Sequence, residues 1–396
     1  MIEIPKEAQV SNSYPTKPLV QKGELPDPFA LPKGNRISSI EEWPLISCKW
    51  REIIVEKEYG GMPPGPGSIE IETLYHSYIH NLLPPPQLNS YRLHCIGGEK
   101  NFSFEVKILI PETSQPPPVI INGDSCWWNV SDEVAKLIAT QGCALILFNR
   151  TALAEDLGYP SVSDPFKQSG GLYDIYPGNT FGAISAWAWG YHRCVDLIFQ
   201  LPNLDKKHIA VTGHSRGGKT ALLAGATDTR IAIINDNASG EGGSSAFRYV
   251  GDEGETIRII EQFPSWFGSG LEDFLDQEDK IPFDQNCFLA LIAPRPLLMT
   301  YALDDRWSNP EGMVQCFWAT KKVYEFLNSS SNIAFHFRKG EHAHSLHDWQ
   351  VLLDFINWKW QGGTPQSPFN RHPYNHLKPI FSWGIPNNLK ENIHGI

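Results

Sequence analysis

The stretch that decides the fold reads Gly213-His214-Ser215-Arg216-Gly217. It follows an apolar run, residues 209–212, and precedes a helix-like run, residues 219–224. A Gly-x-Ser-x-Gly sequence between a strand and a helix is typical of a nucleophile elbow, where the serine takes a strained backbone and the glycines leave room for a sharp turn. Three fixed positions can also arise by chance in a chain with 33 glycines, but the flanking strand and helix patterns favour the elbow. The motif predicts that Ser215 is a nucleophile.

Length and composition limit the class of protein. The chain has 396 residues, which suits one α/β catalytic domain with elaborations. Its 41% hydrophobic and 12% aromatic residues exclude a disordered chain. It has no apolar run long enough to cross a bilayer, so we expect a soluble protein without a membrane partner. A net charge of -11 argues against nucleic acid as a partner, because phosphate binding depends on dense Lys and Arg.

The first residues, Met1 to Glu7, lack the basic and apolar regions of a secretory signal. We therefore expect either a cytoplasmic protein or a secreted one from which the signal has been removed. The seven cysteines show no Cys-x-x-Cys spacing, so most are interpreted as small buried hydrophobic residues and the compartment stays open.

Short apolar runs alternate with helix-like segments along most of the chain. The expected strands are residues 104–110, 118–122, 144–148, 209–212, 231–234, 296–303 and 332–338. The expected helices are residues 40–58, 134–140, 182–201, 309–327 and 347–360. This alternation predicts a mostly parallel sheet covered by helices on both faces, and with the elbow it predicts a three-layer α/β-hydrolase sandwich.

Composition divides the chain into three parts. Residues 1–40 are rich in Pro, Lys and Glu and are expected to form an extended N-terminal arm. Residues 41–360 hold the alternating pattern and are expected to form a single catalytic domain. Residues 361–396 contain five prolines between positions 365 and 386 and show no period, so we expect a tail on the surface.

A serine needs a base to become a strong nucleophile, and in this fold the base follows the last strand. Three histidines lie there, in residues 340–349: His342, His344 and His347. His342 is nearest the strand end and is the expected base, with His344 as the alternative. His347 is expected to begin the final helix. The three could also form a metal tract, but no Cys or carboxylate cluster has a matching spacing, so no metal is expected.

The acid of the triad must accept the second N–H of the histidine and stabilise the imidazolium. Two aspartates, Asp304 and Asp305, follow the expected strand at residues 296–303. We select Asp305, with Asp304 as the weaker candidate, because one of the two is expected to cap a turn or the helix that follows.

The chain also resembles a known family. The stretch from Gly213 to Lys219 is similar to the Gly-[Cys/His]-Ser-Arg-x-Gly-Lys signature of the glucuronoyl esterases, carbohydrate esterases that cleave lignin–carbohydrate esters of 4-O-methyl-glucuronic acid in lignocellulose. An arginine directly after the nucleophile is rare among hydrolases at large. The other stretches that resemble the bacterial branch of the family are Tyr59–Pro63, Asn149–Thr151, Gly171–Pro177, Ala186–Gly190, Ser239–Gly243 and Asp305–Pro310.

The resemblance, which runs from about residue 25 to about 360, implies roles for particular residues. Ser215 would be the nucleophile, His342 the base, and Arg216 an oxyanion stabiliser through its N–H and its guanidinium. The residues that would line the sugar pocket are Lys219, Glu255 and Trp307. The substrate would be a uronic acid ester, and no cofactor is implied.

The sequence also departs from the family pattern. Ala238 stands where many members carry the acid as a glutamate, so the acid must come from elsewhere, as in members that use the aspartate two before the tryptophan, here Asp305. Glu241 is an unusual residue in its run and is a weaker acid candidate. Ser265 replaces a histidine common in relatives.

The sequence therefore predicts a serine carboxylic-ester hydrolase that acts on esters of glucuronic acid through an acyl-enzyme. The alternatives are a carboxylesterase, acetyl esterase or lactonase of other specificity, or a catalytically dead hydrolase fold that serves as a binding module. The presence of both Ser215 and the loop histidines argues against the last. Nothing in the sequence indicates the oligomeric state.

Overall fold

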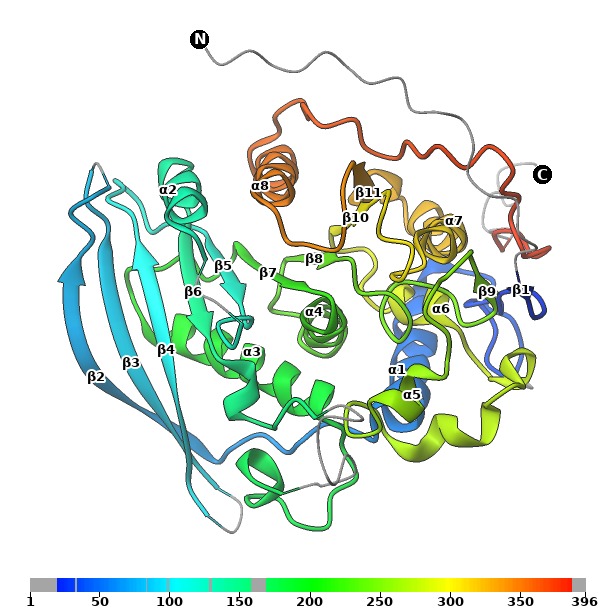
Figure 1. The fold of residues 1–396 in the computed structure, drawn as a ribbon, viewed down its shortest axis with the longest axis horizontal. Helices are drawn as coiled ribbons and strands as arrows, with labels where there is room; N and C mark the ends of the chain where they lie inside the picture. Colours follow the sequence, from blue (N-terminus) through cyan, green and yellow to red (C-terminus); the bar gives the residue numbers. More distant parts are fainter. Residues whose placement is uncertain are drawn as a thin grey trace, which may run out of the picture.

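Figure 1 shows the fold of the chain as a computed structural model. The structure describes residues 20–386, apart from residues 33, 83, 98–99, 128–129 and 158–168. A nine-stranded sheet crosses this part of the molecule in the order β11-β10-β8-β7-β5-β6-β4-β3-β2. The six strands β11, β10, β8, β7, β5 and β6 run parallel to one another within this sheet.

The parallel strands occupy the expected apolar runs. Their bounds are β5 Val119–Asn122, β6 Ala144–Phe148, β7 Ile209–His214, β8 Ile233–Asn237, β10 Leu297–Ala302 and β11 Ile333–Arg338. The expectation for β8, residues 231–234, was wrong at its end, because the strand continues through the polar residues Asn235 to Asn237. These side chains are fully buried. Asn235 and Asn237 are hydrogen-bonded across the sheet, since Thr212 Oγ1 donates to Asn235 Oδ1 at 2.7 Å and Asn237 Nδ2 donates to Thr300 Oγ1 at 2.9 Å, while Asp236 Oδ2 accepts from Ser244 Oγ. Hydrogen bonds between buried polar side chains replace the apolar pattern there.

An antiparallel meander extends the sheet at one edge. It consists of β2 Ser68–Tyr78, β3 Gln87–Ile96 and β4 Phe102–Ile110, and β4 pairs antiparallel with β6. Of these three strands, only β4 was expected from the sequence. The strands β2 and β3 were not predicted, because β2 is mostly exposed and β3 mixes polar and apolar residues. Neither strand therefore shows a long buried run.

Helices cover both faces of the sheet, as predicted for an α/β-hydrolase sandwich (Figure 1). One face carries α2 Asp132–Thr140 and α8 Leu346–Gln361, which share a buried apolar cluster with strands of the sheet. The larger cluster on the other face includes residues of α1 Trp43–Tyr59, α3 Ala183–Gln200, α4 Arg216–Thr227, α6 Gln285–Ala290 and α7 Pro310–Phe326. The remaining short elements are β1 Val20–Gln21, β9 Tyr249–Val250, α5 Ile259–Gln262 and 3-10 turns at Ile40–Glu42, Arg150–Ala152, Gly171–Tyr173, Ser269–Phe274, Glu278–Lys280 and Ser330–Asn332.

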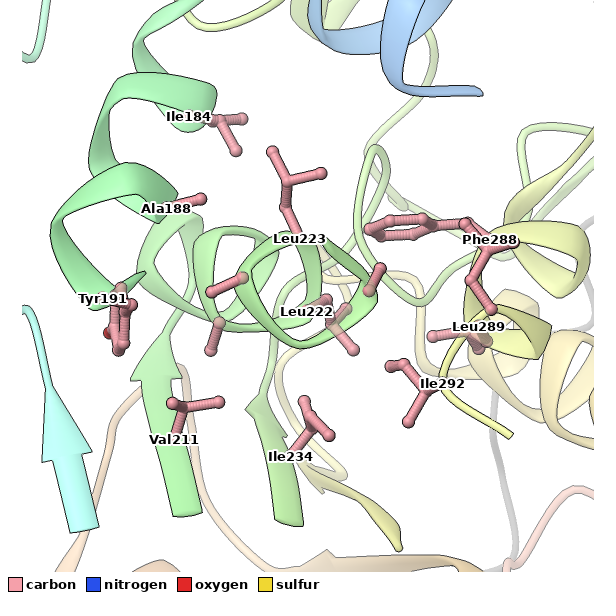
Figure 2. Packing of buried hydrophobic residues seen from close by; sticks show 14 of the residues in the cluster. Ile184, Ala188, Tyr191, Val211, Leu222, Leu223, Ile234, Phe288, Leu289 and Ile292 are labelled. Atoms are coloured by element: carbon pink, nitrogen blue, oxygen red, sulfur yellow. The ribbon is translucent and has the colours of Figure 1, made fainter. Parts of the chain in front are cut away.

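Helix α4, which follows the Gly-His-Ser-Arg-Gly stretch, is held on three sides (Figure 2). Side chains of α3, including Ile184, lie on one side, Val211 and Ile234 of β7 and β8 on a second, and α6 on a third. Leu222 and Leu223 of α4 are fully buried among them. Burying one such side chain stabilises the fold by about 1.5–3 kcal/mol. The packing therefore fixes the start of α4 against the carboxyl ends of β7 and β8.

The two ends of the described chain pack together. The N–H of Leu25 donates to Ile380 O at 2.9 Å, and the Trp383 indole donates to Leu25 O at 2.8 Å. Phe29 is fully buried and meets the Trp383 ring edge to face. The proline-rich segment thus crosses the surface from α8 to the neighbourhood of β1 (Figure 1). Residues 1–19 of the expected arm and 387–396 of the expected tail lie outside the described residues. Among the helices described, none has the length and apolar character to span a membrane.

The turn between β7 and α4 has the strained geometry that the sequence predicts. Ser215 has φ 56° and ψ -122°, an unusual backbone for a residue with a side chain. A Cβ on Gly213 would lie 2.2 Å from the carbonyl oxygen of Gly217, and a Cβ on Gly217 would lie 2.1 Å from Asp124 Oδ1. The N–H of Ser215 donates to Asn237 O at 2.8 Å, which ties the turn to β8. The turn therefore requires glycine on both sides of the serine.

Replacing Gly213 with Ala should disrupt this turn. The new methyl would overlap backbone atoms that cannot move without breaking the contact between β7 and α4, so we expect Gly213→Ala to lower the free energy of unfolding by about 3 kcal/mol or more. Gly65→Ala is the matched control, because a Cβ there meets nothing within 4 Å. Thermal unfolding followed by circular dichroism measures both. Equal stability of the two variants would show that the turn is not constrained in this way.

Candidate active site

Three loops bring the predicted triad residues to one edge of the sheet. Ser215 follows β7, Asp305 follows β10 and His342 follows β11. Parallel strands place their carboxyl ends at the same edge, where loops gather the chemically active groups of this fold class. Strands β10 and β11 are neighbours, so the loops that carry Asp305 and His342 lie next to each other.

Asp305 and His342 form the central contact of the site. Asp305 Oδ2 lies 2.7 Å from His342 Nδ1, and the exposed fractions of the two side chains are 2% and 36%. Ser308 Oγ donates to the same carboxylate oxygen at 2.6 Å and lies 3.1 Å from His342 Nδ1. A carboxylate only accepts, so Nδ1 carries the proton and Nε2 of the neutral ring keeps a free lone pair. This arrangement prepares His342 to accept a proton.

The other acid candidates lie elsewhere. Asp304 Oδ2 accepts from the N–H of Gly340 at 3.0 Å, so Asp304 joins the two loops. Glu241 is fully buried, its Oε1 accepts from Asn309 Nδ2 at 2.9 Å, and burial raises the pKa of this carboxyl well above its usual value. Neither carboxyl contacts His342 among the contacts of the described residues. The geometry thus favours Asp305 as the acid.

The neighbouring histidines have other surroundings. His344 stacks on Trp349 with ring centroids 4.6 Å apart, and burial lowers its pKa. His347 lies in the first turn of α8, with Nε2 3.1 Å from His336 Nε2. Across the residues that the structure describes, no group of three His, Cys, Asp or Glu side chains is placed to hold a metal ion. His342 is the histidine that meets a carboxylate of the predicted pair.

The hydroxyl of Ser215 forms no hydrogen bond with any residue in the described ranges, His342 included. Catalytic hydrogen bonds are often long in unliganded enzymes and tighten when substrate binds. The His342 ring nevertheless lies beside the turn, because its centroid is 4.4 Å from that of His214, the residue before Ser215. Arg216 is the first residue of α4, so its N–H has no partner within the helix and is available to an oxyanion.

The guanidinium of Arg216 is held by aromatic rings and a carboxylate. It lies 4.3 Å from the ring centroid of Trp266 and 5.2 Å from that of Phe263. Its Nη1 donates to Asp156 Oδ1 at 3.0 Å, and the Trp266 indole donates to the same oxygen at 2.9 Å. Cation–π contact and ion pairing together hold in place the guanidinium of the residue that follows Ser215.

This pairing continues into the core. Asp156 Oδ2 accepts from Arg150 Nη1 at 3.2 Å, and Arg150 Nε donates to Asp124 Oδ1 at 3.1 Å. Asp124 Oδ2 accepts from the N–H of His214 at 2.8 Å, so the chain of charges ends at the turn itself. The sequence alone did not indicate a role for Asp124, Arg150 or Asp156. The sequence signal for Arg150 is its place in the family-like run at residues 149–151, whereas Asp156 has no such signal.

The residues expected to contact a sugar differ in exposure. Lys219 and Glu255 are buried, with side chains 2% and 6% exposed; Lys219 Nζ donates to Glu255 Oε2 at 3.2 Å and also to Ser239 O. Trp307 is 51% exposed, and its carbonyl accepts from the N–H of Glu255 at 2.7 Å. Trp307 therefore presents an open ring face, while Lys219 and Glu255 form an ion pair beneath the surface.

A cavity of about 470 Å³ lies beside His342. The residues that line it include Asp124, Trp127, His214, His342, His344 and Trp349. It is bounded by the loop after β5 and the loop before α8, and Lys219, Glu255 and Trp307 are not among the residues that line it.

Several known proteins are similar to this chain in sequence and in structure. The family model for fungal glucuronyl esterases matches residues 93–328. Carbohydrate esterase MZ0003 of an unknown prokaryotic organism is 38% identical over 200 residues, which is 46% of each chain. A carbohydrate esterase family 15 glucuronoyl esterase from Caldicellulosiruptor kristjansonii is 29% identical, with a TM-score of 0.76 over 91% of this chain and 97% of that one. The serine-to-alanine mutant of a Sporotrichum thermophile glucuronoyl esterase, solved with methyl 4-O-methyl-β-D-glucopyranuronate, is 26% identical, with a TM-score of 0.70 over 93% and 96%.

The chain belongs to the glucuronoyl esterase family. This confirms the resemblance noted from the Gly213 to Lys219 signature, and with it the α/β-hydrolase fold. It also makes the protein a carboxylic-ester hydrolase. The assignment of individual residues within this family member rests on the geometry above.

Replacing Asp305 with Asn should disable the base. The amide can donate to Nδ1 and so favours the wrong imidazole tautomer, and it cannot stabilise the imidazolium. We expect Asp305→Asn to lower kcat for p-nitrophenyl acetate by about a hundredfold or more.

Asp304→Asn and Glu241→Gln are the matched controls, because each changes one carboxyl that lies near the site without touching His342. We expect both to retain activity within about threefold of the unchanged protein. A larger loss in Glu241→Gln than in Asp305→Asn would move the acid to the loop after β8.

Proposed function

We propose that this protein hydrolyses esters of 4-O-methyl-glucuronic acid, with Ser215 as the nucleophile. The observation that carries the proposal is the contact between His342 and a buried Asp305 beside the strained serine, in a member of a family with a relative solved in complex with a methyl glucuronate ester. We further propose that residues 41–360 form the catalytic domain.

In the first half of the reaction, Ser215 Oγ attacks the ester carbonyl carbon while His342 Nε2 accepts the hydroxyl proton. The carbonyl oxygen becomes an oxyanion, and Asp305 stabilises the imidazolium that forms. When the tetrahedral intermediate collapses, the carbon–oxygen bond to the alcohol breaks. His342 returns its proton to the departing alcohol, and the glucuronoyl group remains on Ser215.

In the second half, water repeats the attack on the acyl-enzyme. His342 accepts a proton from the water, and the same oxyanion forms again. Collapse then breaks the bond to Ser215, His342 protonates Ser215 Oγ, and the uronic acid leaves. Every proton is accounted for by His342, the alcohol and water, so the reaction needs no cofactor.

Arg216 supplies the positive charge at the oxyanion. Its N–H lies at the positive end of α4, and its guanidinium packs on the ring of Trp266. A donor that is already oriented costs no reorganisation when the negative charge appears, and one lost donor of this kind typically lowers kcat about 100- to 1000-fold. The cation therefore serves the transition state rather than a free carboxylate, because the reacting carboxyl is esterified and neutral.

We place the sugar on the side of Trp307, Lys219 and Glu255. The half-exposed indole of Trp307 offers a flat apolar face suited to a pyranose ring. The buried ion pair of Lys219 and Glu255 lies directly behind the Trp307 backbone. At this place its charged groups can orient a hydroxyl of the sugar.

The substrate class is tested by a hydrolysis panel. Benzyl glucuronate, methyl galacturonate, acetylated xylan and p-nitrophenyl acetate are compared at equal enzyme concentration, with Ser215→Ala as the blank. We expect the highest kcat/KM with benzyl glucuronate, and a loss of at least about a thousandfold in Ser215→Ala. Preference for acetylated xylan would instead identify an acetyl esterase, and preference for p-nitrophenyl acetate a general carboxylesterase.

Trp307→Ala should separate sugar binding from chemistry. A contact made equally with substrate and transition state changes KM alone, so we expect KM for benzyl glucuronate to rise about tenfold with little change in kcat. Hydrolysis of p-nitrophenyl acetate, which has no sugar, should stay within about twofold. Tyr75→Ala is the control, because Tyr75 is similarly exposed on the edge strand β2. Equal losses on both esters would show that Trp307 supports the loop instead of the sugar.

A further inference from the structure

His214 stands between the nucleophile and the base, and the reaction described above gives it no role. It is the last residue of β7 and directly precedes Ser215. Its backbone N–H is fixed by Asp124, and its ring lies against three other rings. The ring centroids are 4.4 Å from His342, 6.1 Å from His344 and 6.1 Å from Trp127.

One ring nitrogen of His214 is locked by a buried amide. His214 Nδ1 lies 2.6 Å from Asn237 Oδ1, and Asn237 is fully buried at the end of β8. The Asn237 amide is itself oriented, because its Nδ2 donates to Thr300 Oγ1 at 2.9 Å while the Thr300 hydroxyl donates to Asp236 O at 3.2 Å. An amide oxygen only accepts, so His214 Nδ1 carries the proton. The ring is held in one tautomer and one orientation.

The surroundings of His214 keep its ring neutral. Burial and the nearby His342, His344 and Arg338 lower the pKa of His214 well below its usual value, although the bond to Asn237 opposes this. In the part of the chain that the structure describes, the carboxylate that contacts His214 is Asp124, and it binds the backbone N–H and not the ring. A second cation at this distance would oppose the imidazolium that His342 must become during catalysis. A neutral ring at the same place, tilted by 42° to the ring of His342, gives His342 a packing partner without that repulsion.

We propose that His214 is a positioning residue: its ring, locked by Asn237, is the surface against which His342 packs so that Nε2 stays directed at Ser215. Asp305 and Ser308 both meet His342 at Nδ1, and contacts at one ring nitrogen leave the ring free to swing about it. The contact with His214 supplies the second restraint. The inference rests on the proposed roles of Ser215 and His342 but not on the identity of the sugar.

Two variants distinguish the effect of the His214 ring from the effect of its hydrogen bond to Asn237. His214→Phe keeps a flat ring against His342 and loses the bond to Asn237, whereas His214→Gln keeps a donor and loses the ring. A small displacement of a catalytic group can lower kcat by up to about a hundredfold. We expect His214→Gln to lower kcat about tenfold or more and His214→Phe to stay within about threefold of the unchanged protein. KM should change less than twofold in both.

The assay uses both p-nitrophenyl acetate and benzyl glucuronate, with the unfolding temperature of each variant measured in parallel. His347→Ala, in which a histidine that faces His336 is removed, is the control and should keep full activity. The proposal is overturned if His214→Gln keeps full kcat, if His214→Phe loses as much as His214→Gln, or if only KM changes. Parallel losses of kcat and unfolding temperature in both variants would show a purely structural role. An unchanged protein that cleaves only p-nitrophenyl acetate would contradict the proposed substrate and leave this comparison intact.

Discussion

The arrangement of the site depends on one strained residue, Ser215, whose backbone is held at φ 56° and ψ -122°. Strain of this kind persists only where the surroundings leave no alternative. Here Gly213 and Gly217 meet with no room for a side chain, the N–H of Ser215 is bonded to β8, and α4 is packed on three sides. The parallel order of β10, β8, β7 and β5 then places the flanking loops around the serine, so the chemistry follows from the turn and the strand order together.

Charge is organised around this turn in a protein with a net charge of -11. Three cations with buried or largely buried side chains lie close to it, and each is paired: Arg150 with Asp124 and Asp156, Arg216 with Asp156, and Lys219 with Glu255. Removing charges from water is costly, so buried pairs of this kind are weak sources of stability. In the proposed reaction, the pairing with Asp156 holds the Arg216 donor in place before the oxyanion forms, which is where electrostatic catalysis gains most.

Much of this could be predicted from the sequence, because local signals carry it. The elbow shows in the spacing of Gly213, Ser215 and Gly217, the parallel strands show as short apolar runs, and Asp305 and His342 follow late strands in the chain order of the fold. The structure then brought Asp305 and His342 within hydrogen-bond distance. The features that the sequence did not predict are either contacts between residues far apart in the chain or buried polar groups. Asp156 meets Arg216 across 60 positions, Asn237 extends β8 with buried polar groups, and the ring contact of His214 with His342 joins loops that no sequence period relates.

The central claim is that the strained turn makes Ser215 the reactive serine of the chain. The most direct test is covalent labelling with a fluorophosphonate, followed by peptide mass spectrometry. The probe reacts with a serine hydroxyl only when a neighbouring base and an oxyanion site activate it. The account predicts one phosphonylated serine, Ser215, and protection of that serine when benzyl glucuronate is present in excess. Labelling at another serine, or no labelling of a folded protein that still hydrolyses the ester, would contradict it.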